Sequence, residues 1–209
     1  EIAGVQRSLE QFITHLNKIG FNARVGLLPY GSYAPSPAGW QKLGHYSDTL
    51  SFIMRSLGAS AGGNEVPYTA INYVLEHAGW NNDAEKHIVL VTDEDSEENG
   101  RYESLSKSEL IRKLGTEFVV HTILSPEDDY NKYATNYTSE ADPREIAKST
   151  NGIIEYTDSW GNVDLANSGI LNFAENSYYV FFEKPETDSI DEVEIIYETN
   201  KGTGYSSSK

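Results

Sequence analysis

The sequence predicts an α/β fold: a doubly wound, mostly parallel sheet flanked by helices, followed by a C-terminal antiparallel β extension. Strand-like apolar segments alternate with amphipathic helical segments over most of the 209 residues, and this alternation is typical of crossover units around a parallel sheet. The strongest segment, 86–92, has four consecutive apolar residues between polar ends, which suits a strand covered on both faces. After residue 176 the helical patterns give way to strand patterns.

Each element follows from a local pattern. Residues 2–19 are predicted to be helical, because apolar residues recur at spacings of three and four and Gly20 suits the left-handed cap position. Ser106 followed by Glu109 is a capping-box pattern. The predicted order is helix 2–19, strand 23–30, loop 31–44, helix 47–57, glycine-rich loop 58–67, helix 68–78, strand 86–92, acidic loop 93–102, helix 106–114, strand 117–124, loop 125–141, helix 142–149, turn 151–152, strand 153–156 and helix 163–173.

Three parts are predicted along the chain. Residues 1–175 form the α/β domain. Residues 176–200 form a β-hairpin extension or the start of a β-sandwich, built from strands 178–183 and 193–198. Residues 201–209 are rich in glycine and serine, and this composition predicts a flexible tail.

The amino-acid composition excludes several classes of partner and of catalytic site. Sixteen basic and thirty-two acidic residues give a net charge of −16, which argues against nucleic-acid binding and against docking on anionic membranes. The charge either maintains solubility or favours cationic partners and metal ions. The absence of cysteine excludes thiol catalysis, zinc-thiolate sites and disulfides. No apolar run approaches the roughly 18 residues of a membrane-spanning helix, so membrane insertion is not expected.

The residues after strand 86–92 are the strongest candidates for chemistry, because ligands of doubly wound sheets bind at the carboxyl ends of the strands. Residues 93–98 hold five carboxylates. They form either a site for a hard cation or a solvated acidic loop. His87 and His121 are interpreted as ordinary strand residues rather than as ligands. Hydrolysis by the acidic loop is the weakest alternative, because its carboxylates share one loop, whereas a catalytic pair of carboxylates usually comes from the facing walls of a cleft.

Three segments together resemble a known family. They are 57–65 (LGASAGGNE), 86–93 (KHIVLVTD) and 147–156 (AKSTNGIIEY), and in this order they resemble a von Willebrand factor A domain, which has a Rossmann-like sheet. Residues 78–83, followed by the strand and TDEDS, are most similar to the inserted domain of integrin β subunits. The resemblance covers about residues 1–175.

The resemblance implies a binding module, often extracellular, that holds one divalent cation (Mg²⁺, Mn²⁺ or Ca²⁺) at the top of the sheet. An acidic side chain of a protein ligand then completes the coordination. Asp93 matches the third metal-binding loop of the family, and Glu65 matches the second, with Asn64 as the alternative. Glu65 stands where the family usually has Thr, and Tyr68 where an integrin β site has Glu.

The first metal-binding motif of the family, Asp-x-Ser-x-Ser, does not occur in the sequence, nor does the strand that precedes it. Three explanations remain open: the chain is a fragment of a longer protein, another chain or a cleaved piece supplies the strand, or the domain is a scaffold without the site. A parallel sheet that lacks a central strand would expose apolar edges. We therefore expect another segment to fill the gap.

The expected function is an extracellular or cell-surface adhesion or protein-binding module that uses a divalent cation and is not an enzyme. The alternative is a self-assembling structural subunit of a surface appendage, filament or particle with a vestigial metal site. Asp95, Tyr30 and Tyr68 are candidate ligand contacts, and core packing is an equally good expectation for the two tyrosines.

Overall fold

The computed structural model of the protein divides into two units, Glu1–Asn176 and Ser177–Lys209. The first unit contains the helices and the larger sheet, and the second contains a two-stranded sheet. The residues that the structure describes are 2–21, 23–28, 30, 41–44, 65–93, 96, 105–125, 142–158, 160–176, 193–199 and 202–208.

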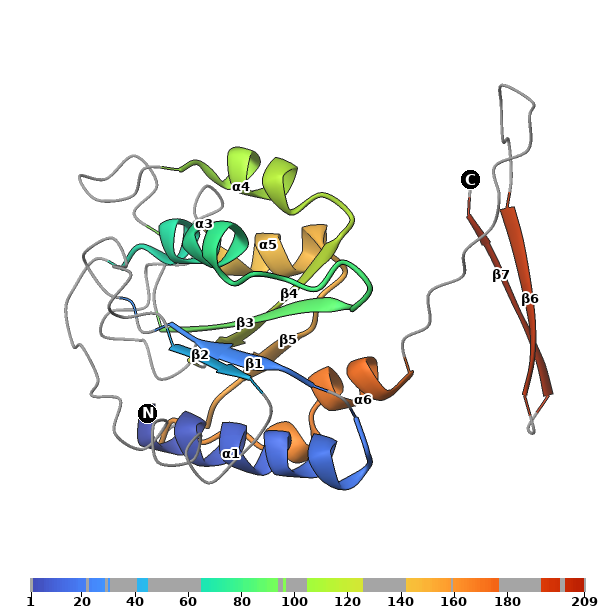
Figure 1. Ribbon diagram of the computed structural model, residues 1–209, viewed down its shortest axis with the longest axis horizontal. Helices are drawn as coiled ribbons and strands as arrows, with labels where there is room; N and C mark the ends of the chain where they lie inside the picture. The colour runs from blue at the N-terminus through green and yellow to red at the C-terminus, as the bar shows by residue number, and fades with distance from the viewer. Residues whose placement is uncertain are drawn as a thin grey trace. The chain divides into compact units, whose positions relative to one another are not determined.

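The elements of the first unit follow the predicted alternation of helices and strands (Figure 1). The strongly patterned segments appear almost where expected, and the 86–92 strand has the predicted bounds. In chain order the elements are α1 (Ile2–Lys18), β1 (Val25–Leu27), β2 (Gln41–Gly44), α3 (Pro67–His77), β3 (Lys86–Thr92), α4 (Lys107–Leu114), β4 (Phe118–Leu124), α5 (Pro143–Ser149), β5 (Ile154–Tyr156), the 3₁₀ helix η2 (Leu165–Asn167) and α6 (Gly169–Asn176).

A three-stranded parallel sheet in the order β3-β4-β5 forms the centre of this unit. β3 and β4 pair in register from Lys86 opposite Phe118 to Thr92 opposite Leu124. Helices α3, α4 and α5 lie on one face of the sheet, and α1 and α6 lie on the other (Figure 1). The predicted doubly wound α/β class is therefore confirmed.

Alternate residues of the strands enter two separate cores, as expected for a sheet covered on both faces. On the α3–α5 face, Tyr68, Ile71, Ile88, Leu90, Leu110, Leu114, Val120 and Ile146 form one buried cluster. On the α1–α6 face, Ile123, Leu165 and Ile170 form another, against which Phe12, Val89, Val91, Ile153 and Val163 pack.

One helix start confirms its capping prediction, and a second is capped by a side chain that the sequence analysis did not single out. Ser106 accepts a hydrogen bond from the backbone N–H of Glu109, and the Glu109 carboxylate accepts one from the N–H of Ser106. This reciprocal box fixes the first turn of α4. Asp142 caps α5, because its carboxylate accepts from the backbone N–H of Arg144 at 2.8 Å.

The strand predicted over 23–30 differs from the structure. Only Val25–Leu27 is a strand, and it pairs antiparallel with β2, which lies in the segment predicted to be a loop. Glycine, proline and serine in 31–44 obscured the short strand at its end. Among the described strands, β3 pairs with none on the side away from β4. The expectation that a further segment fills this side stays a prediction.

The helix predicted over 163–173 is split into η2 and α6. The Asp164 side chain accepts from the N–H of Asn167 at 3.2 Å, and the Ser168 hydroxyl donates to the carbonyl of Leu165 at 2.9 Å. Such side-chain bonds to the local backbone compete with continuous helix formation. They end the 3₁₀ turn before α6 begins at Gly169.

The second unit corrects the expected flexible tail. β6 (Val193–Thr199) pairs antiparallel with β7 (Gly202–Ser208), which falls within 201–209. Only two residues separate the paired Thr199 and Gly202, the length of a tight hairpin connection. Backbone pairing thus orders a segment whose composition indicated flexibility. The predicted helix 47–57 and strand 178–183 lie outside the described residues.

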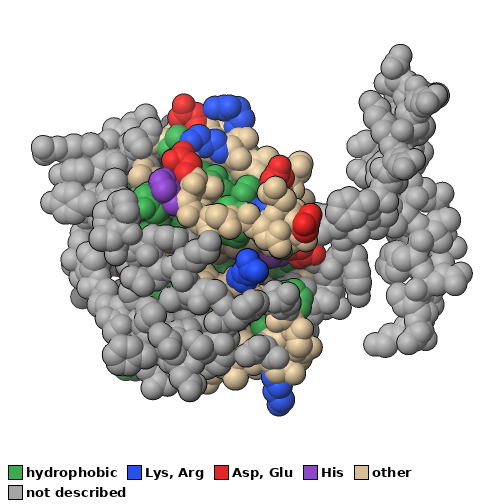
Figure 2. All heavy atoms as spheres, in the orientation of Figure 1, with side chains coloured by type: hydrophobic (Ala, Val, Ile, Leu, Met, Phe, Trp, Pro, Cys, Tyr) green, Lys and Arg blue, Asp and Glu red, His purple; other side chains and the backbone are tan. Residues whose placement is uncertain are grey.

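The described surface carries charges of both signs. Figure 2 shows acidic and basic side chains near one another over the upper part of this face. Within the described segments, no helix combines the length and apolar character required to cross a bilayer.

Candidate functional site

The carboxyl edge of the three-stranded sheet brings two of the predicted ligands to the same strand end. Asp93 follows β3 directly, and Glu65 lies two residues before α3. The hydroxyl of Thr92, the last residue of β3, donates to Oε2 of Glu65 at 3.1 Å. This bond joins residues 27 positions apart in the sequence, and it places the Glu65 carboxylate next to the residue that precedes Asp93.

The edge is also rich in buried polar side chains, which no sequence pattern predicted. Thr92 is buried at the end of β3, Ser125 follows β4, and Thr157 follows β5. The hydroxyl of Thr157 has no hydrogen-bond partner among the described residues. Buried hydroxyls at one sheet edge provide a preformed polar environment, since each group retains capacity to bond water or a ligand.

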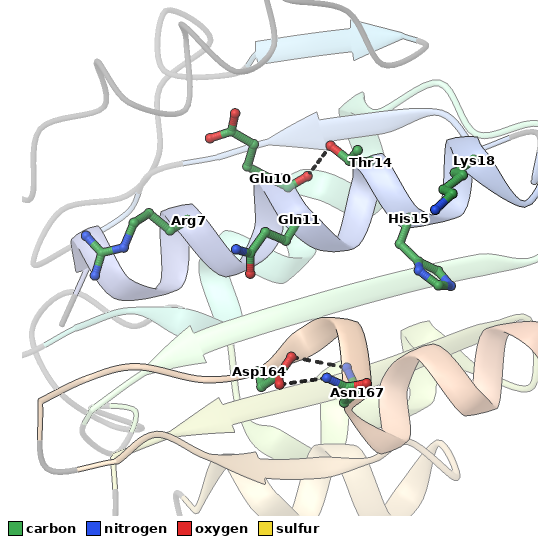
Figure 3. Close-up of a pocket in the computed structure, with 8 residues that line it drawn as sticks. All are labelled: Arg7, Glu10, Gln11, Thr14, His15, Lys18, Asp164 and Asn167. Atoms are coloured by element: carbon green, nitrogen blue, oxygen red, sulfur yellow. Dashed lines mark hydrogen bonds between the residues drawn. The ribbon is translucent and has the colours of Figure 1, made fainter.

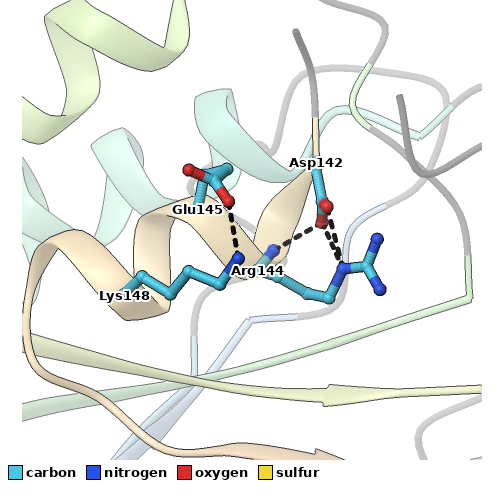
Figure 4. A network of polar contacts seen from close by, with 4 residues as sticks. All are labelled: Asp142, Arg144, Glu145 and Lys148. Atoms are coloured by element: carbon cyan, nitrogen blue, oxygen red, sulfur yellow. Dashed lines mark hydrogen bonds and ion pairs between the residues drawn. The ribbon is translucent and has the colours of Figure 1, made fainter. Parts of the chain in front are cut away.

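Asp142 lies at the start of α5, after the loop that follows β4. Its buried carboxylate accepts from Nε of Arg144 at 2.8 and 3.0 Å, in addition to the backbone N–H that it caps (Figure 4). Glu145 and Lys148 form a separate exposed pair at 2.8 Å one turn further along. The Asp142 carboxylate is thus used to position Arg144 and the helix start.

The two candidate tyrosines have different placements. Tyr30 donates from its hydroxyl to the carbonyl of Val91 at 2.8 Å, so it binds the β3 backbone two residues before Asp93. Tyr68 is fully buried in the α3–α5 core. The structure therefore favours the core-packing expectation for Tyr68. Asn64 and Asp95 lie outside the described residues.

An exposed tryptophan follows β5, and no sequence motif singled it out. Trp160 is 81% exposed. The Asp158 carboxylate accepts from the backbone N–H groups of Trp160 and Asn162 at 2.9 and 2.8 Å and from the Asn162 side chain. These bonds lower the pKa of Asp158, with those from Asn162 contributing most. The loop is thereby held in a shape that presents the indole to solvent.

A concave feature lies between α1 and η2. This open groove has a volume of about 700 Å³ and contains side chains of both charge signs (Figure 3). Neither Glu65 nor Asp93 lines it, and its mixed charges offer no single-sign binding site. Its lining residues are Arg7, Glu10, Gln11, Thr14, His15, Lys18, Asp164 and Asn167.

The donor atoms at the β3 end fit a hard divalent cation in kind. Glu65, Thr92 and Asp93 all offer oxygen, the ligand type that Mg²⁺, Mn²⁺ and Ca²⁺ prefer. Two carboxylates leave most of the coordination sphere to water or to further ligands. In the part of the chain that the structure describes, no group of three or more His, Asp or Glu side chains is arranged to hold a metal.

Comparison with known proteins identifies the fold. The family model of the von Willebrand factor type A domain matches residues 1–168. No curated protein sequence matches the chain. A solved structure of proximal thread matrix protein 1 from the mussel byssus is similar, with a TM-score of 0.57 and 14% identity, over 91% of this chain and 43% of that one. This chain thus spans less than half of the mussel protein, and at that identity the likeness shows the fold alone.

The family match and the geometry agree. The matched residues include the whole three-stranded sheet and the ends of β3, β4 and β5 that carry the polar edge. Because the match extends over most of its length, the chain belongs to the von Willebrand factor type A domain family.

Proposed function

We propose that the chain is an extracellular protein-binding module that holds a divalent cation at the carboxyl edge of its sheet. The observation that carries the proposal is the hydrogen bond from Thr92 to Glu65, because it brings a second carboxylate to the strand end that bears Asp93. Membership of a family of interaction modules supports a binding role rather than catalysis.

In this proposal Asp93 and Glu65 are the protein ligands of the cation. A carboxylate has several lone pairs, so Glu65 can accept from Thr92 and bind a metal ion at the same time. The bound cation would supply a positive centre for an acidic side chain of the protein ligand. Asn64 and Asp95, which adjoin these residues in the sequence, are proposed as an additional metal ligand and a ligand contact.

Trp160 is proposed as an apolar contact for the same protein ligand. β3 and β5 are two strand spacings apart, or about 10 Å, and Trp160 follows β5. Tryptophan is enriched among residues that dominate binding energy at interfaces. A loop already ordered by Asp158 also reduces the entropic cost of binding.

Titration with Mg²⁺ or Mn²⁺ should raise the melting temperature of the whole chain. Binding to the native state alone contributes about 2.7 kcal/mol at a metal concentration one hundred times the dissociation constant. Differential scanning calorimetry, with EDTA as the metal-free reference, measures this shift. Asp93→Asn keeps the size of the side chain but removes its charge, so it should abolish most of the shift.

The matched control for Asp93→Asn is Asp83→Asn, which changes an exposed aspartate that precedes β3, at the opposite end of the strand. The control variant should respond to metal like the natural sequence. An equal loss of the metal response in both variants, or the absence of any shift at millimolar metal, would contradict the proposed cation site.

The second candidate function is a structural subunit of an extracellular assembly. Its support is the likeness of fold to a protein of the mussel byssus matrix and the two-stranded β6–β7 sheet, because an isolated hairpin is marginally stable in water. Additional strands from neighbouring subunits would stabilise such a sheet.

Sedimentation velocity in the presence of EDTA separates the two functions. A structural subunit should form oligomers whose size depends on protein concentration and not on the metal. A cation-dependent binding module should remain monomeric in EDTA. Concentration-dependent assembly in EDTA, together with no thermal response to metal, would favour the structural subunit over the binding module.

A further inference from the structure

Two histidines far from the proposed cation site form a hydrogen-bonded pair inside the α1–α6 face. His87 is the second residue of β3, and His121 is the fourth of β4. Their rings lie nearly parallel, 5.4 Å apart with an interplanar angle of 9°. Nδ1 of His87 is 3.1 Å from Nε2 of His121. His121 is 1% exposed, so water cannot readily replace a bond that it loses.

The surrounding groups fix the direction of every hydrogen bond in this pair. The backbone N–H of Ile153 can only donate, and it lies 3.0 Å from Nδ1 of His121. Neutral His121 must therefore carry its proton on Nε2 and donate it to Nδ1 of His87. Neutral His87 then carries its proton on Nε2, which lies 3.0 Å from a carboxylate oxygen of Glu85. All bonds are satisfied in one arrangement, with both rings neutral.

Helix α6 packs on the pair through one aromatic side chain. The ring of Phe173 meets His87 at 5.8 Å and His121 at 5.4 Å, edge to face in both cases. Phe173 thus connects α6 to both imidazoles. α6 ends at Asn176, and the second unit begins with the next residue, Ser177.

We propose that His87 and His121 form a proton-operated latch that holds α6 on the sheet at neutral pH and releases it on acidification. A proton from solvent added to Nδ1 of His87 leaves two N–H groups facing each other across the pair. Shifting the proton of His121 to Nδ1 only moves the conflict to the N–H of Ile153. Protonation therefore breaks one buried hydrogen bond in either case and separates the rings beneath Phe173.

The charged groups around the pair come from several elements. Glu85, one residue before β3, binds the outer nitrogen of His87 at 3.0 Å, so this contact does not depend on the position of α6. On β5, Glu155 accepts from the backbone N–H of Gly169 at the start of α6 at 2.8 Å. On the opposite face of the sheet, Lys86 pairs with Glu117 at 3.0 Å.

The charged groups of α1, the other helix on this face, belong to the groove described above. Arg7, Glu10, His15 and Lys18 line it together with Asp164 (Figure 3).

The latch is independent of the proposed cation site, because none of its groups belongs to the end of β3. Its failure and the failure of the proposed function can therefore be told apart.

The test is amide hydrogen exchange of the whole chain at pH 7.5 and pH 5, corrected for the intrinsic pH dependence of exchange. Acidification should increase exchange of the α6 amides, including that of Phe173, at least tenfold. Amides of α4, on the other face, should change less than threefold. Imidazole ¹⁵N shifts from the same protein should show Nε2–H tautomers for both rings at pH 7.5.

His87→Asn should abolish the increase in α6 amide exchange at pH 5, because the asparagine oxygen can accept a hydrogen bond from His121 but cannot take a proton at this pH. The matched control is His77→Asn, an exposed histidine at the end of α3 on the other face of the sheet, which should respond like the natural sequence. Unchanged α6 exchange at pH 5 in the natural sequence would overturn the proposal. So would a different tautomer at pH 7.5, or parallel loss of protection in α4 and α6.

Discussion

Lowering the pH from 7 to 5 should reduce the free energy of unfolding by about 2 kcal/mol through His121 alone. Burial, and then the charge of neighbouring His87, lowers the pKa of His121 from 6.5 to about 4. The unfolded chain therefore binds the proton more strongly than the folded chain does. The contribution of His121 to the free energy of unfolding is complete above pH 6.5 and decreases as the pH drops towards 4. Below that value the whole contribution, about 3 kcal/mol, is lost.

Urea denaturation at half-unit steps of pH measures this loss. The interval from pH 7 to 5 isolates it from the exposed carboxylates, because hydrogen bonds lower the pKa values of Glu76, Glu109 and Glu145 below 4.5. His121→Asn should flatten the pH profile while lowering stability at pH 7. A profile for the natural sequence that is already flat between pH 7 and 5 would contradict the buried neutral state of His121.

The sequence was sufficient for elements whose signal is local. Four apolar residues between polar ends determine β3, and Ser106 with Glu109 determines the start of α4; both are confirmed with their bounds or their hydrogen bonds. The fold class follows from the order of such elements. Local composition is misleading where backbone pairing with a neighbouring strand determines the conformation. The Gly- and Ser-rich β7, for example, is a strand because it pairs with β6.

The candidate site was predictable only as a region. Asp93 follows from the rule that ligands bind at strand carboxyl ends, but the contact between Thr92 and Glu65 depends on how α3 packs against β3. The pairing of His87 with His121 likewise depends on strand register, because these residues are diagonal neighbours, with Val89 directly opposite His121. No sequence spacing encodes that register before the sheet is assembled.

Gly152→Ala should cost about 3 kcal/mol of stability, the top of the usual range for overpacking, which is about 1–3 kcal/mol. A Cβ at this position would lie 1.8 Å from the carbonyl oxygen of Val120, a backbone atom of β4. The turn cannot move away easily, because the N–H of Gly152 donates to Ala147 at 2.8 Å and the Thr150 hydroxyl accepts from the N–H of Val120 at 3.0 Å. The clash therefore forces α5 and β4 apart.

Gly115→Ala is the matched control, because it separates steric exclusion from backbone strain. Gly115 has φ +56° and ψ −140°, and no atom lies within 4 Å of the position that a Cβ would take there, so alanine should cost about 1–3 kcal/mol through backbone strain alone. Gly152 immediately precedes Ile153, whose N–H fixes the tautomer of His121. Any Gly152→Ala protein that still folds should therefore also lose the pH dependence of α6 exchange. A loss of stability at Gly152 no larger than about 1 kcal/mol, the low end of the overpacking range, would show that β4 and the turn after α5 do not make the close contact on which both expected effects depend.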